Sequence, residues 1–377
     1  MRVTLTDIAK RLGVTPSTVQ RALNGAPGVS AARRAEIIAL AAEMRYKPNF
    51  FASTLKRGGK RMAVVLPDLD RLNRHYAFYI WQGIHQYMLE AASMGVEVVR
   101  LPVATTQEHN ACLEKLLEGA YGSIDGVITR GIRTHVLDSA FRRLSEAGIP
   151  VVLVGIDLET KNRICCVKCP DAIQGRMAAD LLTGFGGFKT PGAVLVCGNF
   201  AGTDQYNNAC GFEMRMRECG VPVEVQKLTY NVDPLQIRDA LAQAVEGEGH
   251  VCAIYACSAR STIAVCEAIQ HAGMAGRVHA IGSDIFMESA AYMRNGVLQA
   301  VLHSRPTVMA YQAAQALVAT WTHGEAAFGT DLLIDPCVVM RGSLDFYTAS
   351  LPHFESEDTI QSVDAMAMPL RSTAAMV

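Results

Sequence analysis

From residue 61 onward, the sequence alternates between short aliphatic runs and longer amphipathic stretches. Runs such as 62–68 (MAVVLPD) and 149–155 (IPVVLVG) are rich in β-branched residues and have the length of buried strands. The stretches 107–119 and 135–147 instead carry apolar residues at helical spacing, and the scheme repeats in the second half, with a helix over 233–246. Strands that alternate with helices predict parallel sheets. We therefore expect two α/β units whose ligand cleft lies beyond the carboxyl ends of the strands.

The N-terminal segment lacks this alternation and predicts three short helices. Gly13 ends a first run with helical periodicity. Thr15 has the side chain of an N-cap, and Pro16 suits the first position of the second helix, where its missing N–H costs nothing. Ser30 caps a third helix that stops before Pro48, because a residue that precedes proline disfavours the helical conformation. Two short helices joined by a glycine turn are typical of a helix-turn-helix unit.

The charge of the chain is divided between this head and the remainder. Residues 1–61 hold twelve Lys and Arg against three acidic residues, a net charge of +9. The remainder holds 23 basic and 33 acidic residues, a net charge of −10, so the whole chain carries −1. A basic head on an acidic body indicates a polyanionic partner for the head alone. A helical packing unit with solvated charges is the alternative, but the agreement of caps, turn and charge favours DNA binding.

The head resembles the DNA-binding headpiece of the LacI (lactose-repressor) family of bacterial transcription regulators. The matching segments are VTLTDIAKRLGVTPSTVQRALNG, VSAARRAEIIALAAEMRYKPN and FFASTLKRGGK, which cover residues 3–60 without a gap. The resemblance implies that Pro16, Ser17 and Arg21 lie where the family reads bases. Positions at which the family mainly holds phosphates or caps helices are occupied by Thr4, Thr15, Thr18, Asn24 and Asn49.

The chemistry of these side chains ranks them as readers of DNA sequence. The guanidinium of Arg21 can bond to guanine O6 and N7 together, which is worth about 1–3 kcal/mol of discrimination. Pro16 has no side-chain donor and offers only apolar contact, for example to a thymine methyl group. Gln20 stands where the family usually has serine, and a phosphate contact and a base contact both remain open for it.

The segment NFFASTLKRGG resembles the hinge helix of the same family. A helix of about seven residues is not stable alone in water, so we expect it to order only on DNA and in a dimer. Leu55 aligns with the leucine that the family inserts into the minor groove, where it kinks the duplex. The alternative is that Leu55 is a linker residue that contacts the body.

Residues 61–347 resemble the periplasmic-binding-protein-like (type I) effector domain of the family. The resemblance implies a hinged cleft for a small molecule, often a sugar, and a chain that crosses three times between two subdomains. Several ligand positions depart from the family pattern, since Asn208 replaces an arginine, Ser258 an asparagine and Ser304 a glutamine. Asp284 is retained, and its carboxylate suits two sugar hydroxyls.

Other candidates for the cleft lie in the first strand–helix loop and at later strand ends. The loop offers Tyr76, Phe78 and Tyr79, whose rings suit stacking on a sugar, and Arg130 and Asp157 end later strands. The alternative for each is ordinary: aromatic residues at helical spacing pack in cores, and charges at strand ends are solvated. Because several side chains with which the family binds sugars are replaced, an acidic or phosphorylated ligand is left open. Three basic residues suit such a ligand: Arg130, Arg260 and His303.

Motifs of common enzyme classes are missing from the sequence. No GxGxxG follows a strand and opens a helix, and no Walker loop, HExxH or GxSxG occurs. We therefore expect no enzymatic activity and no cofactor. Cys165, Cys166 and Cys169 include one CxxC, but no second CxxC or nearby histidine pair completes a zinc site. We expect no metal and interpret these cysteines as reduced thiols that pack a strand.

These observations predict a homodimeric, DNA-binding transcription regulator, and we expect a repressor that is controlled by a sugar or sugar derivative in the cleft between the lobes. Two-fold symmetry predicts a pseudo-palindromic operator. No apolar run is long enough for a membrane span and residues 1–12 lack the core of a signal peptide, so we expect a cytoplasmic chain. The alternative is a cytosolic solute-binding protein, or an enzyme of the same fold, with a DNA-binding appendix.

We predict four segments with distinct roles. They are a headpiece over 1–47, a hinge helix and linker over 48–60, a ligand-binding and dimerisation domain of two lobes over 61–347, and a flexible tail over 348–377. The tail lacks the leucine heptads of a tetramerisation helix, which is why we expect a dimer.

Overall fold

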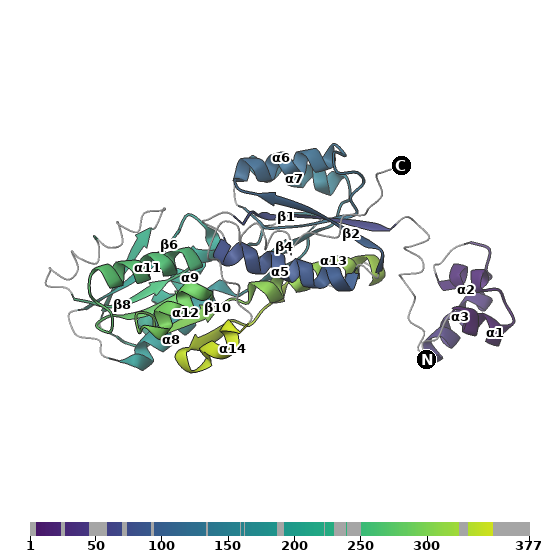
Figure 1. Ribbon diagram of the computed structural model, residues 1–377. Coiled ribbons are helices and arrows are strands. Elements are labelled where there is room, and N and C mark those ends of the chain that lie inside the picture. Colours follow the sequence, from purple (N-terminus) through teal and green to yellow (C-terminus); the bar gives the residue numbers. More distant parts are fainter. Residues whose placement is uncertain are drawn as a thin grey trace. The chain divides into compact units, whose positions relative to one another are not determined.

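A computed structural model describes most of the chain. The described residues are 5–23, 27–44, 59–69, 74–91, 94–132, 135–158, 160–161, 163–186, 192–221, 223–229, 239, 250–323 and 331–349. The predicted helix over 233–246, apart from Asp239, and the candidate DNA contacts Thr4, Asn24, Asn49 and Leu55 lie outside them. The chain forms two compact units, of which the first holds the three N-terminal helices and the second holds two sheets (Figure 1).

The head consists of α1 (Leu5–Leu12), α2 (Pro16–Leu23) and α3 (Ala31–Glu43). Each helix contributes one completely buried aliphatic residue to a shared core: Ile8, Val19 and Ile37. Gly13 has a φ of +62°, a left-handed conformation that favours glycine and that turns the chain between α1 and α2. The predicted caps are confirmed, because Thr15 Oγ1 accepts the N–H of Thr18 at 3.2 Å and Ser30 Oγ accepts that of Arg33 at 3.3 Å.

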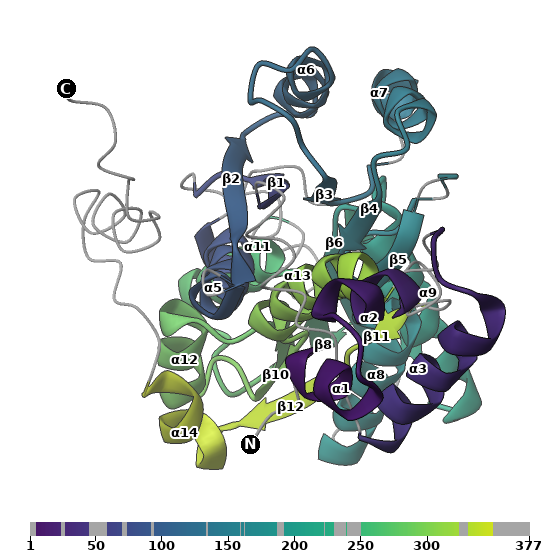
Figure 2. The same cartoon turned by 90° about the vertical axis from the view of Figure 1, so that its right-hand side faces the viewer.

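The first lobe of the body is a six-stranded sheet in the order β11-β5-β4-β3-β1-β2. Its strands are β1 (Lys60–Pro67), β2 (Val96–Val103), β3 (Gly126–Thr129), β4 (Val151–Val154), β5 (Arg163–Lys168) and β11 (Leu332–Leu333). The recorded pairings among β1, β3, β4, β5 and β11 are all parallel. Its helices are α5 (Arg74–Ala91), α6 (Thr106–Leu117), α7 (His135–Glu146) and α13 (Pro306–His323). Figures 1 and 2 show α6 and α7 on one face of the sheet and α5 and α13 on the other.

The second lobe is a six-stranded sheet in the order β12-β10-β9-β8-β6-β7. Its strands are β6 (Gly192–Gly198), β7 (Val223–Thr229), β8 (His250–Ala256), β9 (His279–Ser283), β10 (Ala300–His303) and β12 (Cys337–Met340). The pairings are parallel except that β12 runs antiparallel to β10. The helical elements are α8 (Asp171–Phe185), α9 (Thr203–Glu218), α11 (Ala259–His271), α12 (Met287–Arg294), the short 3₁₀ helix η3 (Arg341–Ser343) and α14 (Leu344–Thr348).

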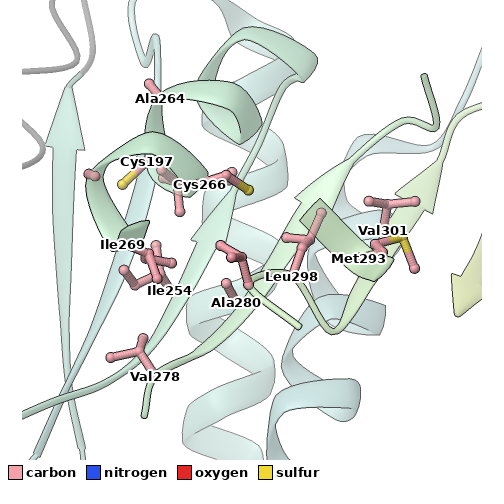
Figure 3. Close-up of a cluster of buried hydrophobic side chains, with 14 of the residues drawn as sticks. Cys197, Ile254, Ala264, Cys266, Ile269, Val278, Ala280, Met293, Leu298 and Val301 are labelled. Carbon is pink, nitrogen blue, oxygen red and sulfur yellow. The ribbon is translucent and has the colours of Figure 1, made fainter. Parts of the chain in front are cut away.

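Each face of the second sheet carries its own apolar core. One core joins the sheet to α11 and α12 through residues such as Ile254, Ile269 and Val301, which are completely buried (Figure 3). The other joins the sheet to α8 and α9, and Phe212 stacks there on Tyr255 with ring centroids 5.3 Å apart. Because both faces are covered, the central strands are apolar almost throughout, as in other parallel sheets.

The chain passes between the lobes three times. It leaves the first lobe after β5, returns between β10 and α13, and crosses once more between β11 and β12. This topology confirms the predicted fold class, a helical head followed by a two-lobed α/β body, and the two helices predicted at 107–119 and 135–147 correspond to α6 and α7. Among the described helices, none is long and apolar enough to cross a membrane.

Candidate functional site

A cleft with a volume of about 510 Å³ lies between the lobes, at the carboxyl ends of the strands of both sheets. Arg130 directly follows β3, Asn199 follows β6 and Asp284 follows β9. Parallel strands place the residues that follow them at one edge of the sheet, which is where ligands bind in folds of this type. Six of the nine residues that the sequence predicted for this site line the cleft: Tyr76, Arg130, Asn208, Ser258, Asp284 and Ser304.

One wall of the cleft carries two carboxyl groups from the first turns of neighbouring helices. Asp171 begins α8, and Asp204 is the second residue of α9. Burial and then the charge of Asp204 raise the pKa of Asp171 to about 7, although Lys168 acts in the opposite direction. Burial also raises the pKa of Asp204, despite hydrogen bonds from backbone N–H groups and the nearby charge of Arg130.

Arg130 and Tyr76, from the first lobe, lie within the electrostatic influence of Asp204. Burial lowers the pKa of Arg130, and the charges of Tyr76 and Asp204 partly offset this effect. The hydroxyl of Tyr76 approaches the chain after β4, since a Cβ atom added at Gly155 would lie 2.8 Å from the hydroxyl oxygen. Gly155 also has a φ of +76°, so both its conformation and the proximity of Tyr76 require glycine there.

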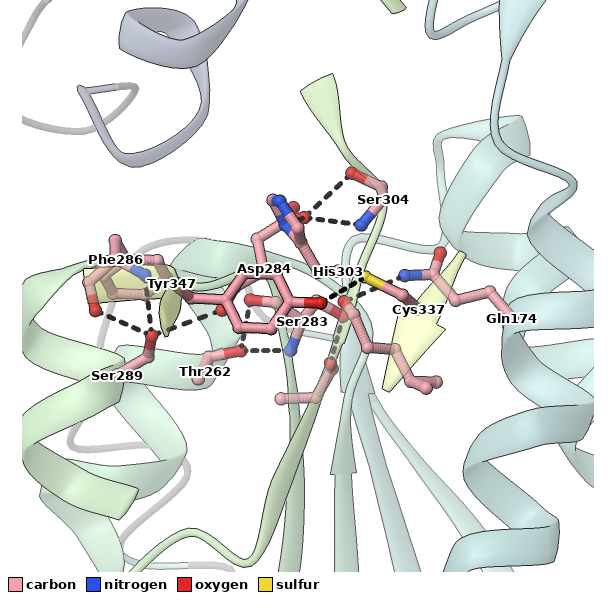
Figure 4. A network of polar contacts seen from close by, with 12 residues as sticks. Gln174, Thr262, Ser283, Asp284, Phe286, Ser289, His303, Ser304, Cys337 and Tyr347 are labelled. Carbon is pink, nitrogen blue, oxygen red and sulfur yellow. Dashed lines mark hydrogen bonds and ion pairs between the residues drawn. The ribbon is translucent and has the colours of Figure 1, made fainter. Parts of the chain in front are cut away.

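Asp284 is held rigidly at the end of β9 (Figure 4). Its Oδ1 atom accepts hydrogen bonds from the backbone N–H and the hydroxyl of Ser304, both at 2.8 Å, and Nδ1 of His303 lies 3.1 Å from the same oxygen. Asp284 has a φ of +63°, a conformation uncommon for a residue other than glycine and one that marks functional positions. Ser304, which replaces the glutamine of the family, therefore orients this carboxylate.

Asn208 lies at the cleft but is engaged within the second lobe. Its Oδ1 atom accepts a hydrogen bond from the hydroxyl of Tyr255 at 2.7 Å, and its Nδ2 atom donates to Oε1 of Gln174 at 3.3 Å. Gln174 in turn donates to the carbonyl of Leu302 at 3.2 Å. The asparagine that replaces the family's arginine thus joins α8, α9 and the sheet, and it brings no charge to the cleft.

Ser258 is the N-cap of α11. Its hydroxyl accepts the N–H of Ser261 at 3.2 Å, and the hydroxyl of Ser261 accepts the N–H of Ser258 at 2.9 Å. This reciprocal capping box satisfies groups at the end of α11 that faces the cleft.

The remaining three predicted residues lie outside the lining of the cleft. Phe78 and Tyr79 pack in a small apolar cluster with Ala259 and Phe286 of the second lobe. The carboxylate of Asp157 is bound by Arg163, at 2.8 Å for Nε, and by Lys168. The same two basic residues contact Asp331, so this ion-pair network joins β5 to the residue before β11.

The lobes touch each other beside the cleft through α5 and α12. The guanidinium of Arg74 lies 2.9 Å from Oε1 of Glu288, and the ring of His75 lies 4.6 Å from that of Phe286. Burial lowers the pKa of His75 to about 4, with the charge of Glu288 acting against it and that of Arg74 with it. His75 is therefore neutral at pH 7, and we call these four residues the interlobe contact.

Among the residues that line the cleft and that sequence reasoning missed are His75, Asp171 and Asp204. Asp171 follows the end of β5 by three residues, and Asp204, the second residue of α9, follows the end of β6 by six residues. The rule that strand ends meet at one edge applies to both positions, so it would have found them had it been applied to every predicted strand.

The candidate DNA-reading residues of α2 form an exposed surface on the head. Thr15, Pro16, Ser17 and Arg21 are exposed, and Thr18 and Gln20 are half-buried. Val19 and Ala22 lie on the opposite side, in the core of the head. The helix thus presents polar side chains along one face, which is the arrangement that a recognition helix requires.

The cysteine cluster contains thiols whose ionisation is suppressed. Cys165, Cys166 and Cys169 are buried, and burial raises the pKa of each. Among the residues that the structure describes, no group of three or more His, Cys, Asp or Glu side chains is placed to hold a metal. Protonated, buried thiols are unreactive and pack as small apolar groups.

Two family models match the chain. Residues 4–49 match bacterial regulatory proteins of the lacI family, and residues 76–326 match the periplasmic binding protein domain. The HTH-type transcriptional regulator DegA of Bacillus subtilis (strain 168) is 27% identical over 290 residues, which cover 73% of this chain and 78% of that protein. The HTH-type transcriptional regulator PtxS of Pseudomonas plecoglossicida is 26% identical over 295 residues, which cover 76% of this chain and 77% of that protein.

Solved structures share the fold of the body. GanP, a glucose-galactose binding protein from Geobacillus stearothermophilus, aligns with a TM-score of 0.63 and covers 76% of this chain and 99% of its own. The two sequences are 19% identical, so the likeness establishes the fold alone.

Proposed function

Because the chain belongs to the lacI family of bacterial regulatory proteins and carries a periplasmic binding protein domain, we propose that it is a transcriptional repressor controlled by a sugar or sugar derivative bound in the interlobe cleft. The observation that carries the proposal is the combination of an exposed, capped recognition helix with a polar cleft at the strand ends of a two-lobed body. GanP, which shares the fold of the body, binds glucose and galactose, and this supports a sugar-like effector.

The proposed DNA contacts follow from the surface of α2. Arg21, which is exposed in the last turn of the helix, reads guanine; Pro16 and Ser17 make lesser base contacts; and Thr15, Thr18 and Gln20 lie beside them. We include the predicted contacts outside the described residues, with Thr4, Asn24 and Asn49 at phosphates or caps and Leu55 as the minor-groove wedge. Two heads in a homodimer then read two half-sites of a pseudo-palindromic operator.

The proposed control operates on the arrangement of the lobes. The cleft takes polar groups from both lobes, Arg130 from one and Asp284 from the other, so a ligand that touches both has a different affinity for each arrangement of the lobes. Only this difference in affinity can shift the equilibrium between arrangements. The domains that we propose to be coupled are the headpiece (1–47), the hinge and linker (48–60) and the ligand-binding domain (61–347), with a tail over 348–377.

Selection of duplexes from a random pool by the full chain tests the proposed DNA binding. We expect enrichment of a pseudo-palindromic site, with an affinity that falls steeply with salt because phosphate contacts release counterions. Arg21→Ala should relax the preference at one symmetric pair of positions, and Arg11→Ala, exposed on α1, should leave that preference unchanged. If Arg21→Ala weakens binding to every sequence equally, Arg21 contacts only phosphate, and if no sequence is enriched, the proposal fails.

A further inference from the structure

Two of the three acids that line the cleft, Asp171 and Asp204, occupy helix ends that would otherwise attract an anionic ligand. The N-cap positions of α8 and α9 are Pro170 and Gly202, which provide no capping side chain. The N–H groups and dipole of such an end favour a negative charge, and a ligand carboxylate or phosphate often provides it. Here Asp171 and Asp204 provide it, and Asp204 accepts hydrogen bonds from its own N–H and that of Gln205. The capping box of Ser258 engages the end of α11 in a similar way.

The cations of the cleft are also engaged by the protein. Among the described residues that line the cleft, three carboxyl groups (Asp171, Asp204 and Asp284) accompany two guanidinium groups (Arg130 and Arg260). Arg130 lies within the electrostatic influence of Asp204, and Arg260 also has an interaction partner within the protein. An anionic ligand would place its charge among these acids, and such a juxtaposition of like charges weakens binding.

One buried donor beside the cleft has no hydrogen-bond partner among the described residues. His75 is 4% exposed, and its Nε2 atom accepts a hydrogen bond from Arg74 at 3.2 Å, so Nδ1 carries the proton of the neutral ring. Nδ1 is buried without a hydrogen-bond partner, since Oε2 of Glu288 lies 3.6 Å away. This neutral N–H group lies beside Glu288 in the interlobe contact, so His75 brings no positive charge to the cleft.

We propose that Asp171 and Asp204 restrict this cleft to uncharged polyhydroxylated ligands, such as aldoses and polyols, and exclude their carboxylate and phosphate derivatives. This proposal rests on the proposed function, because it places the effector in the interlobe cleft. Ionised Asp204 only accepts hydrogen bonds and so matches hydroxyl donors, Asp171, whose pKa is about 7, both accepts and donates, and Arg130 donates to hydroxyl oxygens. The acidic or phosphorylated ligand that the sequence left open is disfavoured. His303, one of the three basic residues that suggested such a ligand, is paired with Asp284.

The test compares matched ligands on the full chain. Thermal shift and titration calorimetry are carried out with glucose, galactose and mannose, with the uronate and the 6-phosphate of each, and with myo-inositol. The variant is Asp204→Asn, and the matched control is Asp180→Asn. Asp180 lies on the exposed part of α8 and pairs with Arg215 of α9. Both variants remove one negative charge, so only a local effect separates them.

The expected result is that the uncharged member of each sugar set binds at least about tenfold more tightly than its anionic derivatives. Asp204→Asn should reduce this ratio by about tenfold, and Asp180→Asn should preserve it. An anionic derivative that binds as tightly as its parent, a ratio unchanged by Asp204→Asn, or the absence of binding by every one of these compounds would each overturn the proposal. Failure of the proposed DNA binding is detected separately, in the duplex selection, which uses none of these compounds.

Discussion

At the scale of single residues, the cleft is defined by side chains that hold one another in place. Asp284 is oriented by Ser304 and His303, Asn208 by Tyr255, and Ser258 by its own helix cap. The substitutions that distinguish this chain from the family pattern are therefore part of the protein's internal network, and all three, Asn208, Ser258 and Ser304, have hydrogen bonds before any ligand arrives. The proposed selectivity then depends on the acids in the first turns of α8 and α9, Asp171 and Asp204.

The raised pKa of Asp171 predicts a stability that depends on pH. Its pKa is about 7 in the folded protein, against the ordinary value of 3.8 that applies to the unfolded chain. The folded state therefore binds more protons between these values, and the contribution of Asp171 to stability falls as pH rises through this window. Asp171→Asn removes the free-energy cost of ionising this buried carboxyl group. Relative to the parent, it should gain about 1–2 kcal/mol more at pH 8 than at pH 5, after an allowance for the lost charge at the start of α8.

Thermal unfolding of the full chain at the two pH values measures this difference. Asp180→Asn, exposed on the same helix, serves as the control, and its effect should be the same at pH 5 and pH 8. A gain by Asp171→Asn that does not grow with pH would show that Asp171 ionises normally. His75 contributes with the opposite sign, because its lowered pKa makes stability fall as pH drops from 6.5 toward 4.

At the scale of elements, the closeness of α8 and α9 brings the two acids together. The helices pack through Gly175 and Gly211. A Cβ atom at Gly175 would lie 1.9 Å from the carbonyl oxygen of Asn208, and one at Gly211 would lie 2.1 Å from that of Ala172. Only glycine, which lacks a Cβ atom, permits this close contact at the two positions. The contact places the first turns of both helices at the cleft.

Gly175→Ala should therefore force α8 and α9 apart. Overpacking at a backbone contact costs about 1–3 kcal/mol or more, so we expect a lower midpoint of thermal unfolding and weaker ligand binding. Gly184→Ala, in the last turn of the same helix, meets no atom within 4 Å and should be neutral or stabilising by up to about 1 kcal/mol. Equal stability of the two variants would contradict the close packing.

The sequence was sufficient to predict the elements but only part of the site. Periodicity and caps predicted the helices of the head and the α/β body, because these signals are local: Thr15 and Ser30 act within three residues of themselves. Phe78 and Tyr79 could not be placed, because helical spacing does not show which neighbour a ring will meet. Asp157 has the sequence position of a free strand-end charge, but Arg163 binds it, and Arg163 is itself held by Asp331, 168 positions further along the chain. Contacts of this range depend on topology, which periodicity does not encode.

At the scale of the whole molecule, the chain combines a DNA-binding head with a two-lobed body that resembles a binding protein. The chain crosses between the lobes at three points, between β5 and α8, β10 and α13, and β11 and β12, and the interlobe contact of Arg74 with Glu288 joins α5 to α12. A ligand in the cleft competes with or supports such contacts. Coupling between cleft and operator is then a difference in free energy between two arrangements of the lobes.

The most direct measurement is the affinity of the full chain for its selected operator, at fixed salt, with and without a saturating concentration of the sugar that binds best. Ligand control of DNA binding predicts a change of about 5- to 150-fold, and the operator must change the affinity for the sugar by the same factor. An operator affinity that stays the same at ligand saturation would show that the cleft does not control the head, and would contradict the proposed function.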